Sequence, residues 1–221
     1  MFGRPEIIGF GGGDFCVREI DRKLANEMIR KNHYSGKFFS LSYIHLGVIM
    51  RGKIVGCIQI GYAMNPASGG SIVPDTKNDE FCELNRMWLS DDAPRNSESM
   101  AISFAIKYIR AKYPKIKFMQ SFADERCGRL GIVYQAANFQ YYGRHDSEFW
   151  ELDGVFYHNI IMTNGQSNAA NARYLRENRE RATKHVFGQY RYIFWIQKKF
   201  RSRCALPEFE YQKHYAGTSD E

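Results

Sequence analysis

The sequence predicts an α/β protein in which helices flank a mixed β-sheet. Strand-like and helical segments follow one another along the 221 residues in the order strand, helix, three strands, helix, strand, helix, strands. Amphipathic segments of helical period alternate with short apolar runs bounded by turn residues. There is no internal repeat and no low-complexity tract, so we expect a single domain over residues 1–221.

The N-terminal elements are the clearest. A strand is expected at 15–20, followed by a helix at 21–32 that Asp21 opens as N-cap. Two strands within 41–66, joined by an Arg-Gly-Lys turn, predict a hairpin. Residues 67–80 are so rich in Gly, Pro and Asp that an irregular loop is expected there.

The remaining elements alternate between strands and helices. The strongest is an amphipathic helix at 97–113, whose apolar residues recur at helical spacing and which Pro114 ends. The others are a strand at 81–90, a strand at 116–124, a helix at 131–142 ended by Gly143, a hairpin or bent strand at 147–162, a basic helix at 171–186 and a final strand at 190–199.

Cysteine usage and hydropathy indicate a cytosolic protein. The five cysteines stand singly, with no CxxC or CxxH pair, which argues for reduced thiols and against a disulfide framework or a zinc ribbon. No apolar run approaches the roughly 20 residues needed to span a bilayer. The N-terminus lacks the charged-then-apolar order of a secretory signal.

The net charge of +7 is concentrated near the C-terminus. Between Asn171 and Arg203, ten basic residues face two acidic ones, so the rest of the chain sums to about −1. Interspersed Tyr, His and Trp side chains make this segment typical of a face that binds nucleic acid, although a solvated helix face is the simpler alternative. The expected nucleic-acid contacts are Arg173, Arg176, Arg179, Arg181, Lys184, Lys198 and Lys199.

The stretch RKNHYSGKFFS places His33 and Tyr34 at the end of a predicted helix, with Gly36 just beyond. A helix C-terminus presents side chains toward a cleft, and its dipole favours a protonated imidazole. A capping histidine and a packing tyrosine are the structural alternative.

Several motifs together carry a family resemblance. The element order resembles the GNAT acyltransferases. The motifs NHYSG, ELNRMWL, SFAD, YQAANFQYYG, WELDGVFYHN and YRYIFWI, in this order, are similar to the Mom family of phage DNA-modification proteins. The resemblance covers roughly Ile29 to Lys198.

This resemblance implies a GNAT-like mixed twisted sheet flanked by helices, with a basic C-terminal helix and a final strand. It also implies a phage-encoded enzyme that converts adenine in double-stranded DNA to N6-carbamoylmethyladenine and so protects the DNA from host restriction. Chemistry at adenine N6 requires the base to leave its stack, hence a basic track and an aromatic pocket. We expect the pocket between the strands that end at Leu89 and Asp124, where the sheet splays.

Adenine N6 is a poor nucleophile, so the site needs a general base and a group that holds the adenine in place. Asp124 is the preferred carboxylate, with His33 as proton carrier and Tyr34 as hydrogen-bond donor; all three match positions that the resemblance marks as functional. For Asp124 the alternative is a helix N-cap. Arg86 lies mid-strand and is expected either to pair with Glu83 or to meet an anionic ligand.

Three further residues are candidates for binding the substrate or the donor. Ser99 and Ser121 would supply hydroxyls, and Tyr134 lies where many GNAT enzymes carry a general acid; caps and core packing are the alternatives. The segment PRNSESM departs from the glycine-rich turn with which GNAT enzymes bind coenzyme A, because it lacks the glycines that let backbone N–H groups approach phosphate.

The donor therefore stays open between glycyl-tRNA and an acyl-CoA. Iron held by His33, Asp124 and a tyrosine is a further alternative, although the chain offers no HxD or HxH spacing. Two other function classes remain: an acetyl-CoA-dependent N-acetyltransferase acting on a protein or small amine, and a noncatalytic DNA-binding protein. The oligomeric state is not predicted.

Overall fold

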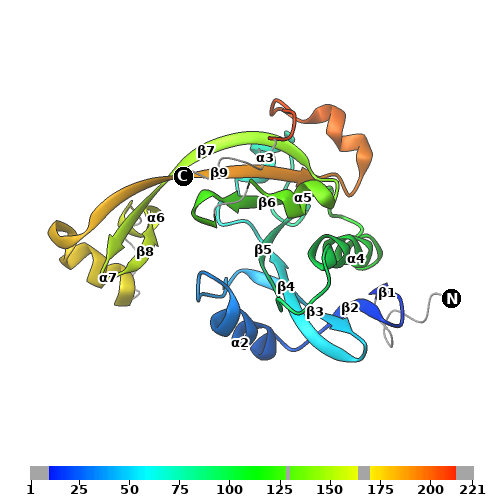
Figure 1. Cartoon of the computed structure of the whole chain (residues 1–221). Coiled ribbons are helices and arrows are strands. Elements are labelled where there is room, and N and C mark those ends of the chain that lie inside the picture. Colours follow the sequence, from blue (N-terminus) through cyan, green and yellow to red (C-terminus); the bar gives the residue numbers. More distant parts are fainter. Residues whose placement is uncertain (1–9, 128–129, 164–169, 213–221) are drawn as a thin grey trace, which may run out of the picture. The chain divides into compact units, whose positions relative to one another are not determined.

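The computed structural model of the chain describes residues 10–127, 130–163 and 170–212 (Figure 1). Contacts divide the chain into two compact units. Unit 1 comprises residues 1–121, 132–142 and 192–211, and unit 2 comprises residues 122–131, 143–191 and 212–221. The single domain expected from the sequence stays a prediction. None of the helices in the described ranges is long and apolar enough to cross a membrane.

The strands form a mixed sheet, as predicted. Their order is β1-β2-β3-β4-β5-β6-β9-β7-β8. Neighbours from β1 to β5 and the β7–β8 pair are antiparallel, whereas β5 and β6 are parallel. The strands are β1 (Phe10–Gly11), β2 (Phe15–Glu19), β3 (Ser42–Met50), β4 (Lys53–Gly61), β5 (Phe81–Leu89), β6 (Phe118–Asp124), β7 (Gln140–Leu152), β8 (Val155–His158) and β9 (Thr183–Phe194).

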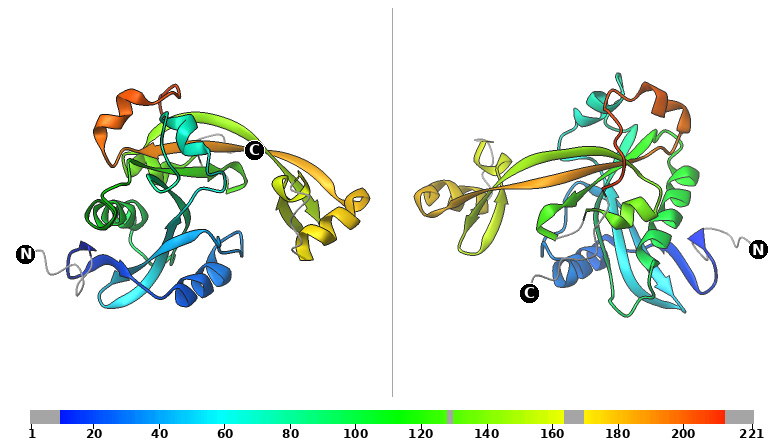
Figure 2. Two further views of the ribbon diagram at one scale, coloured as in Figure 1. Left: turned by 180° about the vertical axis from the view of Figure 1, so that it is seen from behind. Right: turned by 45° about the horizontal axis from the view of Figure 1, so that its top comes forward.

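Two long helices pack on unit 1. Helix α2 (Arg22–Asn32) begins where the side chain of Asp21 accepts the backbone N–H groups of Lys23 and Leu24 at 2.7 and 3.4 Å, the predicted N-cap. It contacts β3, β4 and β5, while α4 (Ser97–Lys112) contacts β1 and β2. In the views of Figures 1 and 2 the two helices lie on either side of strands β2–β5.

The parallel pair β5–β6 separates early. Its register covers only Phe81–Glu83 and Phe118–Gln120. At the point of separation, the amide Nε2 of Gln120 donates to Oε2 of Glu83 at 2.8 Å. The splay that the sequence predicted in this sheet therefore begins at Glu83 and Gln120.

The core of unit 1 corrects one expectation. Within the predicted irregular loop, the residues Ser68–Ile72 form a helix, α3. Ile72 and Val73 are fully buried with Phe81 and Phe118. Gly69 lies against the ring of Phe81, where a Cβ would come within 2.6 Å of a ring carbon. Burial of apolar side chains thus outweighs the turn-forming composition of this segment.

Two other expectations were wrong in extent. The helix predicted at 131–142 is only α5 (Ile132–Ala136), because Asn138 takes a left-handed φ of 62° and β7 begins two residues later. The basic helix predicted at 171–186 ends sooner, as α7 (Ala170–Glu177) and a 3-10 turn, η2 (Arg179–Arg181), before β9 starts at Thr183. Aromatic and β-branched side chains favour the strand in both places.

Unit 2 is built on the β7–β8 hairpin, one of the two arrangements that the sequence predicted for residues 147–162. Its two-residue turn is Asp153-Gly154, and both residues have positive φ, as in a type I′ turn. A small core of Leu152, Tyr157 and Leu175 joins the hairpin to α7. The short helices η1 (Glu125–Cys127) and α6 (Ile160–Thr163) also belong to unit 2, and η3 (Lys198–Arg203) belongs to unit 1.

Candidate functional site

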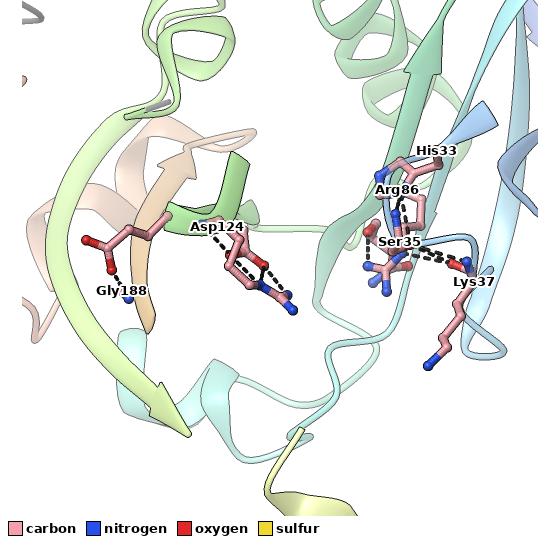
Figure 3. A network of polar contacts seen from close by, with 9 residues as sticks. His33, Ser35, Lys37, Arg86, Asp124 and Gly188 are labelled. Atoms are coloured by element: carbon pink, nitrogen blue, oxygen red, sulfur yellow. Dashed lines mark hydrogen bonds and ion pairs between the residues drawn. The ribbon is translucent and has the colours of Figure 1, made fainter. Parts of the chain in front are cut away.

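His33 forms the C-cap of α2, and its backbone N–H donates to the carbonyl of Ile29 at 3.0 Å. Its ring nitrogen Nδ1 accepts the backbone N–H of Ser35 at 3.1 Å and lies 2.9 Å from the Ser35 hydroxyl (Figure 3). Because Nδ1 serves as an acceptor, the proton of the neutral ring is assigned to Nε2. Ser35, two residues after the histidine, therefore fixes which ring nitrogen of His33 carries the proton.

Burial, together with the positive charge of Arg86, lowers the pKa of His33 to about 4. The expectation that the helix dipole would keep this imidazole protonated is therefore wrong. Desolvation disfavours the charged ring, and a guanidinium adds like-charge repulsion. At neutral pH His33 is a neutral ring that donates through Nε2.

Tyr34 lies against His33. The two ring centroids are 4.3 Å apart with the planes tilted by 34°. Tyr34 is 64% exposed, so one side of this aromatic pair faces solvent. The structure thus brings the two predicted neighbours into a stacked pair, and neither ring is buried in the core.

Arg86 lies on β5 beside this pair (Figure 3). Its Nε donates to the carbonyl of Lys37 at 3.1 Å and its Nη1 to the carbonyl of Asn85 at 2.6 Å. Glu83, which the sequence offered as one of two partners for Arg86, accepts hydrogen bonds from the amides of Asn85 and Gln120. Arg86 therefore ties β5 to the loop after His33.

Asp124 ends β6 and is 8% exposed. Its carboxylate accepts Nε and Nη2 of Arg126 in a bidentate pair, as well as the backbone N–H of Arg126 at 3.0 Å. Burial opposes ionisation, but the hydrogen bonds and charge of Arg126 outweigh it and lower the pKa of Asp124. Asp124 is thus an ionised, paired carboxylate, which makes it a weak base.

Arg126 is a residue that sequence reasoning missed. Its guanidinium carbon lies 4.2 Å from the ring centre of Phe149, 5.4 Å from that of Phe187 and 5.6 Å from that of Phe156. Asp124 therefore orients a cation among three aromatic rings of unit 2. The available signal was the Asp-x-Arg spacing directly after a buried strand.

The predicted residues fall into two groups. His33, Tyr34 and Arg86 come together in unit 1, whereas Asp124 belongs to unit 2. The convergence of Asp124 with the other three stays a prediction. The same holds for the pocket expected between the strands that end at Leu89 and Asp124.

The candidate serines are engaged in main-chain contacts. The hydroxyl of Ser99 donates to the carbonyl of Asn96 at 3.0 Å, and that of Ser121 donates to the carbonyl of Leu84 at 3.1 Å. Tyr134 stacks in an aromatic cluster 5.6 Å from Phe139 and 5.5 Å from Tyr192. The contacts of Tyr134 match the packing alternative, whereas neither serine hydroxyl caps a helix; substrate roles for the three stay predictions.

The start of α4 differs from what PRNSESM suggested. Asn96 takes a left-handed φ of 70°, a backbone conformation that glycine favours, and its side chain does not cap the helix. Ser97 is 1% exposed, and its hydroxyl has no hydrogen-bond partner among the described residues. The segment thus reaches a glycine-like turn without glycine.

Three cations of the basic segment are paired with carboxylates within unit 2. Arg173 pairs with Glu177 at 2.7 Å, Arg181 pairs with Asp153 at 2.7 Å, and Lys184 pairs with Glu148. Unit 2 contains ten basic and ten acidic residues, so the entire formal excess of +7 belongs to unit 1. Folding places Glu148 of β7 and Asp153 of the following turn beside Lys184 and Arg181, two cations that look unopposed along the chain.

No group of three or more His, Cys, Asp or Glu side chains within the described ranges could hold a metal ion. The cysteines that the structure describes are free thiols, with Cys57 and Cys82 buried and Cys127 exposed. Iron binding stays a prediction.

Comparison with solved structures shows the fold. The chain is similar to NAA60 of Arabidopsis thaliana in complex with a bisubstrate analogue, with a TM-score of 0.52 and 10% identity over 82% of this chain and 97% of that one. The acetyl-CoA complex of NAA60 gives a TM-score of 0.50, also at 10% identity, over 82% and 99% of the two chains. The predicted GNAT-like α/β fold is confirmed.

Comparison with sequences shows the family. The chain is 49% identical over 209 residues to the methylcarbamoylase mom of Escherichia phage Mu, covering 95% of this chain and 87% of the relative. The family model described as the Mom protein family matches residues 14–213. The chain therefore belongs to the Mom protein family.

Proposed function

We propose that the protein is a DNA-modifying transferase that converts adenine to N6-carbamoylmethyladenine and thereby protects phage DNA from host restriction. The observation that carries this proposal is the 49% identity to a methylcarbamoylase along 95% of the chain. The GNAT-like fold supports group transfer to an amine. The enzyme would act in the cytoplasm of the host cell, where its double-stranded DNA substrate is found.

His33 and Tyr34 would hold the reacting groups. A neutral imidazole that donates through Nε2 polarises a carbonyl oxygen without needing to be protonated first. The His33 ring is neutral because its pKa is about 4, and it carries its proton on Nε2 because Nδ1 accepts the backbone N–H of Ser35. We therefore assign His33 to the donor carbonyl, and the exposed ring of Tyr34 to stacking on the extruded adenine.

Asp124 would act through Arg126. A carboxylate paired with a guanidinium removes protons poorly, but it fixes the plane of that guanidinium. The aromatic rings around Arg126 make its surroundings suited to a flat, electron-rich base. In this role Asp124 is a positioning residue.

A glycyl donor such as glycyl-tRNA accounts for the carbamoylmethyl product. N6 would attack the glycyl carbonyl and release the tRNA hydroxyl, which leaves an amide on C6. The glycyl amine would then attack C6 through a five-membered ring, and the bond from C6 to the original N6 would break. That nitrogen leaves as the carboxamide NH2 and the product is C6–NH–CH2–C(O)NH2, with all atoms balanced and no oxidant needed. Acyl-CoA would instead give a stable amide.

The test is nucleoside mass spectrometry of plasmid DNA from cells that express the protein. We expect carbamoylmethyl-deoxyadenosine with the wild type and its loss with His33→Asn, while Lys53→Gln on the exposed β3–β4 turn serves as control. Unmodified adenine with the folded wild type would overturn the proposal. Acetyl-CoA turnover under the same conditions would select the N-acetyltransferase, and DNA binding alone the noncatalytic protein.

The donor is tested in a purified reaction. The enzyme, duplex DNA and tRNA charged with isotope-labelled glycine are expected to place both glycyl carbons and the glycyl nitrogen in the modified adenine. If the enzyme is active in cells but no nucleoside carries the label in this reaction, glycyl-tRNA is excluded as the donor.

A further inference from the structure

We propose that the solvent-facing side of α2 binds the phosphate backbone of the duplex DNA that flanks the target adenine. The inference rests on the proposed function and adds a surface to it. The surface consists of Arg22, Lys23, Arg30 and Lys31, all exposed, and is named here the α2 cationic face. Sequence reasoning had placed the DNA contacts in residues 171–203.

The four cations line up along the helix. Arg22 and Arg30 share one i, i+4 ridge of the helix through Asn26, and Lys23 and Lys31 share the neighbouring ridge through Glu27; both ridges run obliquely along the helix. Eight residues of helix span about 12 Å, close to the axial length of three or four phosphates along one strand at ~3.4 Å each. A shallow hollow of about 370 Å³ follows the same side, lined by Asp21, Arg22, Lys23, Asn26, Glu27 and Arg30.

Two carboxylates, those of Asp21 and Glu27, line the same hollow as the cations, but neither is in an ion pair with one of them. Within the part of the chain that the structure describes, none of the four forms an ion pair. Arg22 donates to the carbonyl of Ser40 at 3.1 Å, and Arg30 lies 4.8 Å from the ring centre of Phe38. Both contacts hold a side chain in place and leave its charge uncompensated.

Unit 2 shows the opposite arrangement. Its residues Arg173, Arg181 and Lys184 each have a carboxylate partner, and its formal charge sums to zero. A phosphate would have to displace those carboxylates, whereas the α2 cationic face meets it directly. Counterion release, the main source of affinity for duplex DNA, therefore favours unit 1.

The α2 cationic face also leads to the stacked pair. The helix ends at His33, and Tyr34 follows with 64% of its surface exposed. Lys37 and Arg86 lie beside His33 (Figure 3). DNA that tracks along α2 thus arrives at an exposed aromatic ring flanked by cations, which is where an extruded base is expected.

The test compares two variants with equal charge loss. Lys23→Gln, Arg30→Gln and Lys31→Gln are combined in one protein, and Arg173→Gln, Arg176→Gln and Arg179→Gln in the other; the melting temperature verifies the fold. At about 0.1 M salt we expect the α2 variant to bind a short duplex at least about tenfold more weakly, with the slope of log K against log salt reduced by about 2 to 3. The variant with the three substitutions in α7 and η2 is expected to show smaller changes in affinity and in slope.

A gain of affinity separates the effect from misfolding. Glu27 is exposed on the same side of α2, so Glu27→Gln is expected to tighten DNA binding about two- to fivefold. Unchanged affinity and slope in the α2 variant would overturn the inference, as would weaker binding of uncharged tRNA with intact binding of duplex. Because binding is measured without modification, failure of the proposed chemistry would leave this result standing and be recognised separately.

Discussion

The guanidinium of Arg86 lies beside the imidazole of His33, and its charge adds to burial in lowering the pKa of that histidine to about 4 (Figure 3). The same guanidinium binds the carbonyls of Lys37 and Asn85, so the loop after His33 and strand β5 are held together by one side chain. A basic residue thus holds the loop beside the proposed catalytic histidine and adds to the desolvation that keeps its ring neutral.

Replacing Arg86 by Gln should raise the pKa of His33. The substitution removes the repulsion from a positive charge but leaves the desolvation, which is the larger cause, so the pKa should move only part of the way toward 6.5. NMR titration of the imidazole carbons measures this shift. Arg95→Gln, an exposed change before α4, is the control, and equal shifts in both variants would contradict the assignment.

The pH dependence of stability should carry the signature of His33. Its pKa is lower in the folded state than in the unfolded state, so the unfolded chain binds more protons between about pH 4 and 6.5. Stability is therefore fully present above about pH 6.5 and decreases as the pH falls toward 4. Between pH 7 and 5 the share of His33 should be on the order of 1 to 2 kcal/mol, allowing for its partial exposure.

Urea unfolding of the wild type and His33→Gln at pH 7 and pH 5 isolates the contribution of His33 to the pH dependence of stability. The pKa values of His45, His145 and His158 are also lowered, so the wild-type curve sums several groups. Only the difference between the two proteins reports on His33. Parallel curves would show that the ring is not buried in its neutral form.

The Asp124–Arg126 pair should behave as a unit. Arg126→Gln leaves a carboxylate that is 8% exposed without its counter-charge, which should cost roughly 3 kcal/mol of unfolding free energy. Adding Asp124→Asn removes the stranded charge and should restore part of that loss. Denaturation of both single variants and the double variant gives the coupling energy, and additive losses would argue against a shared role.

Tyr34 should act through its ring more than through its hydroxyl. Tyr34→Phe keeps the stacked surface 4.3 Å from His33 and should keep most of the DNA modification. Tyr34→Ala should lose about tenfold or more, since stacking of one base on an aromatic side chain contributes about 1 to 3 kcal/mol. Modified nucleoside per unit time is the readout. Equal loss in both variants would assign the function to the phenol hydroxyl.

Two adjacent glycines in α3 offer a matched pair for stability. A Cβ on Gly69 would lie 2.6 Å from the ring of Phe81, whereas the nearest atom to one on Gly70 is 3.9 Å away. Gly69→Ala should therefore destabilise unit 1 by roughly 1 to 3 kcal/mol. Gly70→Ala should be neutral or slightly stabilising, because alanine favours the helix. Equal thermal shifts would mean that α3 does not pack as described.

Local sequence determined much of this protein. The Asp21 cap predicted α2, the Arg-Gly-Lys turn predicted the hairpin of β3 and β4, and helical spacing predicted α4. Such features depend on residues within a few positions of one another, so they can be read along the chain. The family resemblance was also carried by short motifs, and comparison confirmed it.

Tertiary structure decided the properties that depend on distant neighbours. The pKa of His33 is set partly by Arg86, 53 positions away, and Asp124 is tied to Arg126 among rings from other strands. Arg181 and Lys184 look uncompensated in sequence but meet Asp153 and Glu148 in space. Charge and burial act through space over a few ångströms, so counting charges along the chain found the basic segment, while only the fold showed which of its cations are paired with carboxylates.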